Sequence, residues 1–176
     1  MAGHNKWAQI KRQKGKTDAE KSKLFSKFSR LITVEAKKSG GNKNSPSLKA
    51  VIDRAKAANM TNDAIERAVK KSSDNAAAME PITYEAYGPG GCAIVIEALT
   101  DNRNKAAQEI KFILSKNGFS LAGIGAATWA FEKSLEAGWV PKTTVALEDE
   151  DVAKLDTLVT ELEANDEVQD VYTNAE

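Results

Sequence analysis

The spacing of the hydrophobic residues changes near residue 75, and this change constrains the fold more than any other feature of the chain. Before it, apolar residues such as Leu24, Phe28 and Leu31 recur every three or four positions, as on one face of a helix. After it, short apolar runs such as 92–99 are bounded by turn residues, as buried strands are. The pattern predicts an α+β chain with two domains, 1–75 and 80–176.

The first domain is predicted to be a three-helix bundle. One helix is expected over residues 17–38, ended by Gly40 and Gly41. A second is expected from Ser45, a cap residue followed by a proline at the first helical position, and a third from the cap residue Thr61. Each helix has one apolar stripe, so the three are expected to bury their stripes against one another.

The second domain is predicted to be a ferredoxin-like split β-α-β fold with an extra leading strand. Strands are expected at 82–87, 92–99, 128–131, 143–147 and 168–172, with one helix over 103–116 and another opened by the acidic residues 148–151. From residue 92 onward the order is β-α-β-β-α-β. The run 88–91, Gly-Pro-Gly-Gly, is interpreted as a tight turn, with close backbone approach to a phosphate or base as the alternative.

The chain is neutral overall but strongly polarised in charge. Residues 1–75 contain 18 Lys/Arg and 7 Asp/Glu, a net charge of +11, whereas residues 76–176 carry −11. Such asymmetry points to nucleic acid or an anionic membrane as the partner of the basic half. No apolar run approaches the ~20 residues of a membrane span. The net charge of +11 over 75 residues, together with the basic leader, favours nucleic acid.

The candidate nucleic-acid-binding residues lie in a basic leader and along the first predicted helix. Lysine and arginine neutralise phosphates and release counterions, and the flat ring of Trp7 offers a stacking face for an unpaired base. The helix lysines are expected to project mostly away from the apolar stripe. Arg103, at the start of a predicted helix, is a weaker candidate. The full set is Lys6, Trp7, Lys11, Arg12, Lys14, Lys16, Lys21, Lys23, Lys27, Arg30 and Arg103.

Catalytic chemistry is not expected. Cys92 is the only cysteine and His4 the only histidine, so neither a disulfide, a zinc site nor a His-dependent nucleophile is predicted, and no cofactor is expected. Cys92 is interpreted as a small core residue, Glu85 as a solvent-facing strand residue and Asp101 as a helix cap. No secretory leader is recognised, so a cytoplasmic location is expected.

Several motifs in this order resemble those of the YebC family, which includes a mitochondrial translational activator of cytochrome c oxidase. The resemblance spans nearly the whole chain. It implies a non-enzymatic cytoplasmic regulator of gene expression, described in the family both as a DNA-binding transcriptional regulator and as a ribosome-associated translation factor. The matching segments are 1–7, 10–11, Asp18, Lys21, Lys23, Phe25 and Lys27, 57–60, 65–68, 84–85, 87–91, 99–104, 115–118 and 171–174.

The resemblance also implies a difference from the family. Its members usually carry a further α+β domain between the segment ending near Phe131 and that starting near Thr143, where this chain has only residues 133–142. We expect a shortened variant with two domains.

Three functional hypotheses remain open at this point. The first is an RNA-binding, ribosome-associated translation factor that binds rRNA. It is preferred because a lysine-rich helix suits contacts to backbone phosphates better than the reading of DNA bases. The others are a DNA-binding transcriptional regulator and a protein-interaction module. The oligomeric state is not defined by the sequence, and a monomer is the expectation.

Overall fold

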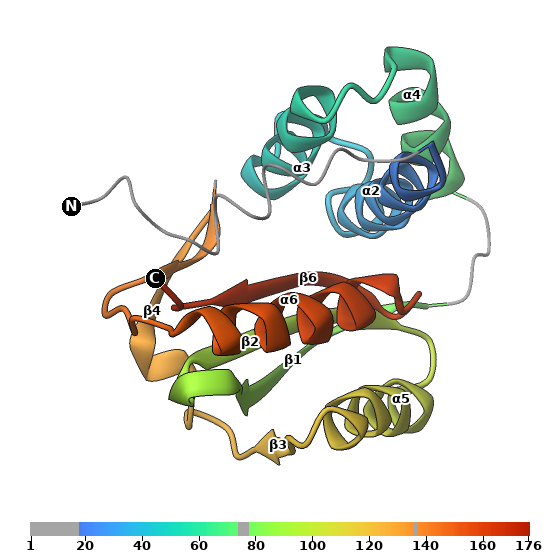
Figure 1. Ribbon diagram of the computed structural model, residues 1–176. Helices are drawn as coiled ribbons and strands as arrows, with labels where there is room; N and C mark the ends of the chain where they lie inside the picture. Colours follow the sequence, from blue (N-terminus) through green and yellow to red (C-terminus); the bar gives the residue numbers. More distant parts are fainter. Residues whose placement is uncertain (1–17, 74–77, 136) are drawn as a thin grey trace. The chain divides into compact units, whose positions relative to one another are not determined.

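A computed structural model describes residues 18–73, 78–135 and 137–176, and within them the chain folds as two compact units that divide between Met79 and Glu80 (Figure 1). The first unit contains three helices. The second contains two helices and two sheets. The α+β class predicted from the sequence is confirmed.

The helical unit consists of α2 (Asp18–Lys38), α3 (Pro46–Ala57) and α4 (Asn62–Lys71). As predicted, their apolar stripes meet in one core, with Ile32, Leu48 and Ile65 fully or almost fully buried. The Thr33 hydroxyl donates to the Ala68 carbonyl, 2.9 Å away, and so ties α2 to α4. The three-helix bundle is therefore confirmed.

The two predicted helix caps behave differently. The Thr61 hydroxyl accepts a hydrogen bond from the backbone N of Ala64 at 3.2 Å, so it caps α4 as expected. Ser45 precedes Pro46 as predicted, but its side chain makes no capping hydrogen bond. Only the backbone of Ser45 contributes, through its carbonyl, which accepts from the N–H of Lys49.

The main sheet of the second unit has four strands in the order β3-β1-β2-β6, and each neighbouring pair is antiparallel. These strands are β1 (Glu80–Tyr87), β2 (Ala93–Thr100), β3 (Leu121–Ala122) and β6 (Val168–Thr173). Because β2 and β3 both run antiparallel to β1, which lies between them, β2, α5 (Arg103–Lys116) and β3 form a split β-α-β unit. A split β-α-β unit is thus present as predicted, but its second strand is β3 and not the expected strand at 128–131.

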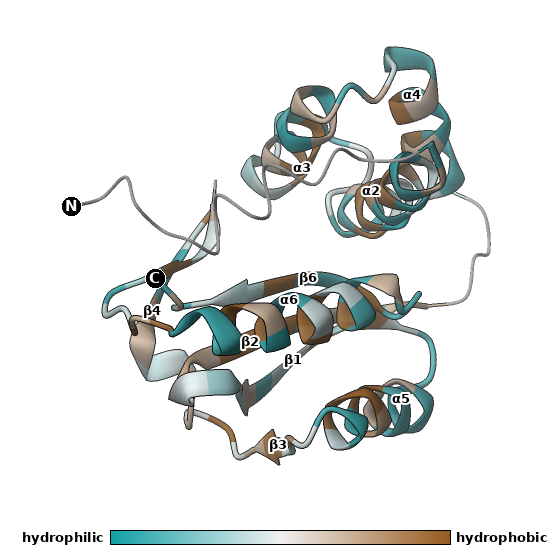
Figure 2. Ribbon diagram, viewed as in Figure 1, coloured by the Kyte–Doolittle hydropathy of each residue, from teal (hydrophilic) through white to brown (hydrophobic). Residues whose placement is uncertain are grey.

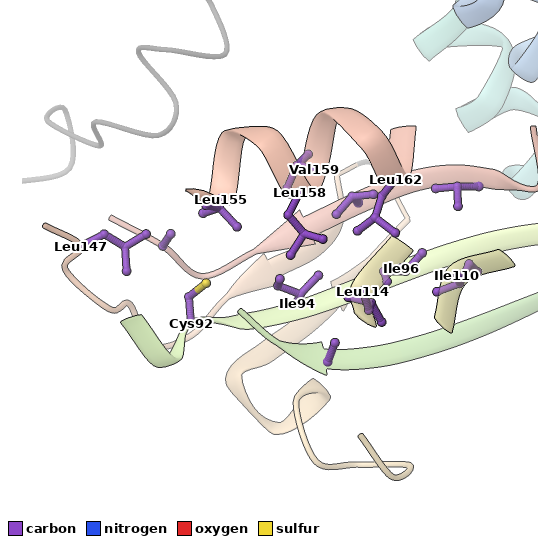
Figure 3. Close-up of a cluster of buried hydrophobic side chains, with 14 of the residues drawn as sticks. Cys92, Ile94, Ile96, Ile110, Leu114, Leu147, Leu155, Leu158, Val159 and Leu162 are labelled. Atoms are coloured by element: carbon purple, nitrogen blue, oxygen red, sulfur yellow. The ribbon is translucent and has the colours of Figure 1, made fainter. Parts of the chain in front are cut away.

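Helices α5 and α6 (Asp149–Ala164) cover one face of this sheet. Ile94 and Ile96 of β2 point into that layer, against Ile110 of α5 and Leu158 of α6 (Figure 3). In Figure 2 brown and teal residues follow one another along α6, as expected for a helix with one apolar stripe. Cys92 is fully buried in this core, as predicted.

The opposite face of β2 is covered by a different layer. Ala93 and Val95 pack against Ala127, Ala130 and Phe131. Phe131 begins β4 (Phe131–Ser134), which forms a hairpin with β5 (Gly138–Pro141). Strand β2 is thus buried on both faces, which explains its continuous apolar run. The run 88–91 forms a tight connection between β1 and β2 that contains the short helix η1 (Pro89–Gly91), as the turn interpretation predicted.

Two predicted strands are wrong. The first part of 128–131 is the short 3₁₀ helix η2 (Thr128–Ala130), and the strand there begins only at Phe131. Residues 143–147 contain an isolated bridge from Val145 to Ala175 and no strand. Both segments have strand-like apolar residues, but Ala130 is buried from the 3₁₀ helix and Leu147 from irregular backbone.

Candidate nucleic-acid interface

Positive charge is concentrated in the helical unit. Its described residues 18–73 contain 13 Lys/Arg and 6 Asp/Glu. Each helix carries two basic residues in its last turn, where they also interact favourably with the negative end of the helix dipole. These residues are Lys37 and Lys38, Arg54 and Lys56, and Lys70 and Lys71.

The four predicted cations of α2 differ in exposure. Lys21 is exposed, Lys23 and Arg30 are half-buried, and Lys27 is only 8% exposed. The expectation that these side chains project away from the apolar stripe is therefore wrong for Lys27. Lys27 follows Leu24 by three positions and precedes Leu31 by four, so it stands at the edge of the stripe, where a lysine stem is readily buried.

The other predicted cations fall into two groups. Arg103 opens α5, in the second unit, where its Nε lies 3.2 Å from Oε1 of Glu80 and its side chain stays 69% exposed. The predicted leader residues lie outside the described part of the chain. They are Lys6, Trp7, Lys11, Arg12, Lys14 and Lys16.

A lysine cluster that the sequence analysis missed surrounds Glu66 of α4. Lys43, from the loop between α2 and α3, forms an ion pair with Glu66, and both side chains are about half exposed. Lys56 of α3 and Lys70 of α4 lie within electrostatic reach of the same carboxylate. The hydrogen bond from Lys43, with the charges of all three lysines, lowers the pKa of Glu66.

Three lysines near one carboxylate leave a net positive charge at this part of the surface. Only the Glu66–Lys70 spacing of four residues is visible in the sequence. Lys43 and Lys56 are brought to it by the packing of α3 against α4, so the sequence pattern alone gave no reason to select them.

The interpretation of Glu85 as a solvent-facing residue is wrong. Glu85 is 5% exposed, and its carboxylate accepts hydrogen bonds from the backbone N of Gly125, Ala127 and Thr128 at 2.7, 3.0 and 2.7 Å. Burial by itself raises the pKa of Glu85, but the three backbone donors outweigh it and hold the pKa below its ordinary value. Glu85 thus fixes the loop that leads into η2.

The helix cap before α5 also differs from the expectation. Asn102, not Asp101, is the N-cap, and its Oδ1 accepts from the backbone N of Lys105 at 3.1 Å. Asp101 is exposed. The hydroxyl of Thr100 accepts from the N–H of Asn102 at 2.9 Å and stabilises the same turn.

The described residues contain no group of three or more His, Cys, Asp or Glu side chains placed to hold a metal ion. Burial raises the pKa of Cys92, which disfavours the reactive thiolate. Over the same residues, no helix has both the length and the apolar character that a membrane crossing requires.

The described residues therefore define a basic three-helix unit followed by an acidic sheet-and-helix unit. Comparison with known proteins finds this combination elsewhere. Residues 5–75 match the family profile "TACO1/YebC protein N-terminal domain", and residues 79–137 and 132–175 match "TACO1/YebC second and third domain". The chain belongs to the TACO1/YebC family.

Individual relatives agree with this assignment. A "probable transcriptional regulatory protein" of Thermosipho africanus is 37% identical over 237 aligned positions, covering 100% of this chain and 94% of the relative. One of Fervidobacterium nodosum is 51% identical over 136 positions, covering 76% and 54%. The crystal structure of a conserved hypothetical protein from Aquifex aeolicus superposes with a TM-score of 0.81 at 30% identity, covering 97% of this chain and 96% of that one.

The comparisons also locate a length difference. The alignment with the Thermosipho africanus protein spans 237 positions although this chain has 176 residues, so it includes a stretch of the relative without a counterpart here. The two segments matched by the second profile meet in the β4–β5 hairpin. This is the connection where the sequence predicted a shortened variant.

Proposed function

We propose that this protein is a non-enzymatic nucleic-acid-binding regulator of gene expression that contacts phosphates through residues 1–75. The observation that carries the proposal is the lysine cluster around Glu66, within a segment whose net charge is +11. Lysines from a loop and from two helices lie within electrostatic reach of Glu66, as expected for a surface that contacts a polyanion. The names of the relatives, which refer to transcriptional regulation, support the same broad function.

RNA is the favoured ligand, and a ribosome-associated role in translation is the finer proposal. The cations of this surface are mainly lysines, which act as point charges and suit backbone phosphates. Residues 80–176 carry most of the acidic residues, so phosphates are contacted mainly by the first unit. The family resemblance to a translational activator supports RNA, and a cytoplasmic location goes with this role.

Sequence-specific DNA binding is the second candidate, and one structural feature favours it. Helices α3 and α4 are joined by the short turn 58–61, as in a helix-turn-helix, and α4 exposes Asn62 and Arg67, two residue types that read base edges. The names of the relatives point in the same direction. Base reading through α4 predicts discrimination between promoter sequences, which phosphate contact does not.

The experiment compares both ligands over a salt series. We expect the purified protein to co-sediment with ribosomes and to bind RNA with an affinity that falls steeply with salt. Replacement of Lys11, Arg12 and Lys14 by alanine should weaken the binding. The slope of the logarithm of the binding constant against the logarithm of the salt concentration should flatten by about 0.7 to 0.9 for each phosphate that is no longer neutralised. Preferential binding to promoter fragments would favour the DNA alternative. Failure to bind either polyanion in dilute buffer would refute the proposal, and co-purification with a protein alone would favour an interaction module.

A further inference from the structure

The acidic unit exposes a small group of large apolar side chains beside the loop that Glu85 fixes. Trp129 of η2 is 57% exposed and Tyr87, at the end of β1, 38%, while Ile124 in the loop between β3 and η2 is fully exposed. We call these three residues the Trp129 platform. The chain segments that build it, 86–96 and 117–131, contain no charged residue, although the unit as a whole is acidic.

The platform is held rigidly by hydrogen bonds that use up its polar atoms. The indole Nε1 of Trp129 donates to the hydroxyl oxygen of Tyr87 at 2.9 Å, and the Tyr87 hydroxyl donates in turn to the carbonyl of Ala126. The Glu85 carboxylate accepts three backbone N–H groups from residues 125–128, on the same loop. With these polar groups satisfied, what the platform offers a ligand is aromatic surface.

Rigidity matters because a ligand then binds without ordering the site. Side chains that are already fixed lose little conformational entropy on binding. Single exposed aromatic side chains are common on soluble proteins. Here two of them, one at the end of β1 and one on η2, are joined by a hydrogen bond. The arrangement matches the stacking surfaces on which proteins hold unpaired bases.

The small size of the platform favours a nucleic-acid base over a protein as its ligand. A stable protein interface buries about 800 Å² on each partner and involves about 20 residues or more. The three side chains of the platform fall far short of that area, whereas one or two bases need only a ring face. A basic residue close to η2 also suits nucleic acid, because the exposed Lys142 is held there by its backbone N–H, which donates to the Ala130 carbonyl at 2.8 Å.

We infer that the Trp129 platform is a stacking site for an unpaired base of single-stranded nucleic acid, with Lys142 contacting the adjoining phosphate. The inference rests on the proposed function and adds to it a second contact, located in the unit that carries net negative charge. A base held there contributes affinity through stacking, which depends little on salt, while the lysines of the first unit contribute the salt-dependent part.

The test measures binding of a fluorescein-labelled single-stranded RNA, and of the same sequence as a duplex, over a salt series. Trp129→Ala should weaken single-strand binding by about tenfold with an unchanged salt slope, and Trp129→Phe should restore much of the affinity. Duplex binding should change little, because its bases are already stacked. Phe112→Ala is the matched control, since Phe112 is a comparably exposed aromatic residue on α5 of the same unit.

Two results would overturn the inference while leaving the proposed function intact. One is single-strand binding by Trp129→Ala equal to that of the unchanged protein. The other is a decrease that appears equally with Phe112→Ala, or that accompanies a change of oligomeric state in sedimentation, which would make the platform a protein interface. If the unchanged protein binds no RNA, the proposed function itself fails, so the two failures are distinguishable.

Discussion

The carboxylate of Glu85 accepts a hydrogen bond from the backbone N–H of Thr128, with 2.7 Å between Oε1 and N. Gly125 and Ala127 donate to the same carboxylate, so one buried charge holds the loop between β3 and η2. Replacing Glu85 by glutamine should lower the free energy of unfolding by about 2 to 4 kcal/mol, because the amide has only one acceptor oxygen and leaves buried donors unpaired. Urea denaturation measures this change.

The control for this substitution is Glu132→Gln. Glu132 lies on β4 of the same unit and is exposed, so its replacement should change the unfolding free energy by less than about 0.5 kcal/mol. Equal stability of the two variants would contradict the assigned role of Glu85.

The same carboxylate predicts a pH dependence of stability. The pKa of Glu85 is lowered in the folded protein, so the folded state favours the ionised form more than the unfolded chain does. Its contribution is therefore fully present above the pKa of an unfolded glutamate and is lost as the pH falls through the lower folded pKa. Denaturation measured from pH 7 down to the acid range should show a decline in stability that is smaller in Glu85→Gln. Identical declines would argue against this linkage.

Glu85 also shows why part of the structure was not predictable. It stands between Tyr84 and Ala86, so strand alternation puts it on the side of β1 that faces away from α5 and α6, and such a face is often solvated. Here the loop 123–128 covers it, more than 35 residues further along the chain. Nothing local in the sequence predicts that contact.

The helices were predictable because their causes are local. The period of the apolar stripe and the Pro46 and Thr61 signals lie within each segment, and α3 and α4 begin where these residues indicate. The strand predictions at 128–131 and 143–147 failed because the burial of these residues has a non-local cause. Their apolar residues are buried by tertiary packing, against the second face of β2 for Ala130 and under α6 for Leu147, and burial alone does not specify a strand.

The lysine cluster around Glu66 gives a prediction with opposite signs for neighbouring residues. Replacing Lys56 and Lys70 by alanine should weaken RNA binding and flatten its salt slope, whereas Glu66→Gln should strengthen binding, because it releases Lys43 from its ion pair and removes a negative charge. Fluorescence anisotropy over a salt series measures both effects.

The matched controls are Lys111→Ala on α5 and Asp63→Asn, one turn before Glu66 on α4. Lys111→Ala should leave the slope unchanged. Asp63→Asn should raise affinity less than Glu66→Gln, because it releases no lysine of the cluster. Weaker binding by Glu66→Gln would refute the assignment of this surface to phosphate contact.

The β4–β5 hairpin depends on a glycine at its turn. Gly138 has a φ of 73°, and a Cβ atom at this position would overlap the hydroxyl of Tyr172 on β6. Gly138→Ala should therefore lower the free energy of unfolding by about 2 kcal/mol, through backbone strain and steric overlap. Gly123→Ala is the control, because a Cβ there meets nothing within 4 Å. Thermal denaturation that ranks the two variants alike would contradict the hairpin geometry.

Thr61 and Ser45 precede helices of the same bundle but differ in what their side chains do. The Thr61 hydroxyl accepts from the Ala64 N–H, whereas the Ser45 side chain makes no such bond. Thr61→Ala should therefore cost about 1 kcal/mol of stability, and Ser45→Ala only a few tenths. Chemical denaturation of both variants, followed by circular dichroism at a helix-sensitive wavelength, distinguishes the two. A larger decrease in stability from Ser45→Ala would show that α3 begins with a side-chain cap after all.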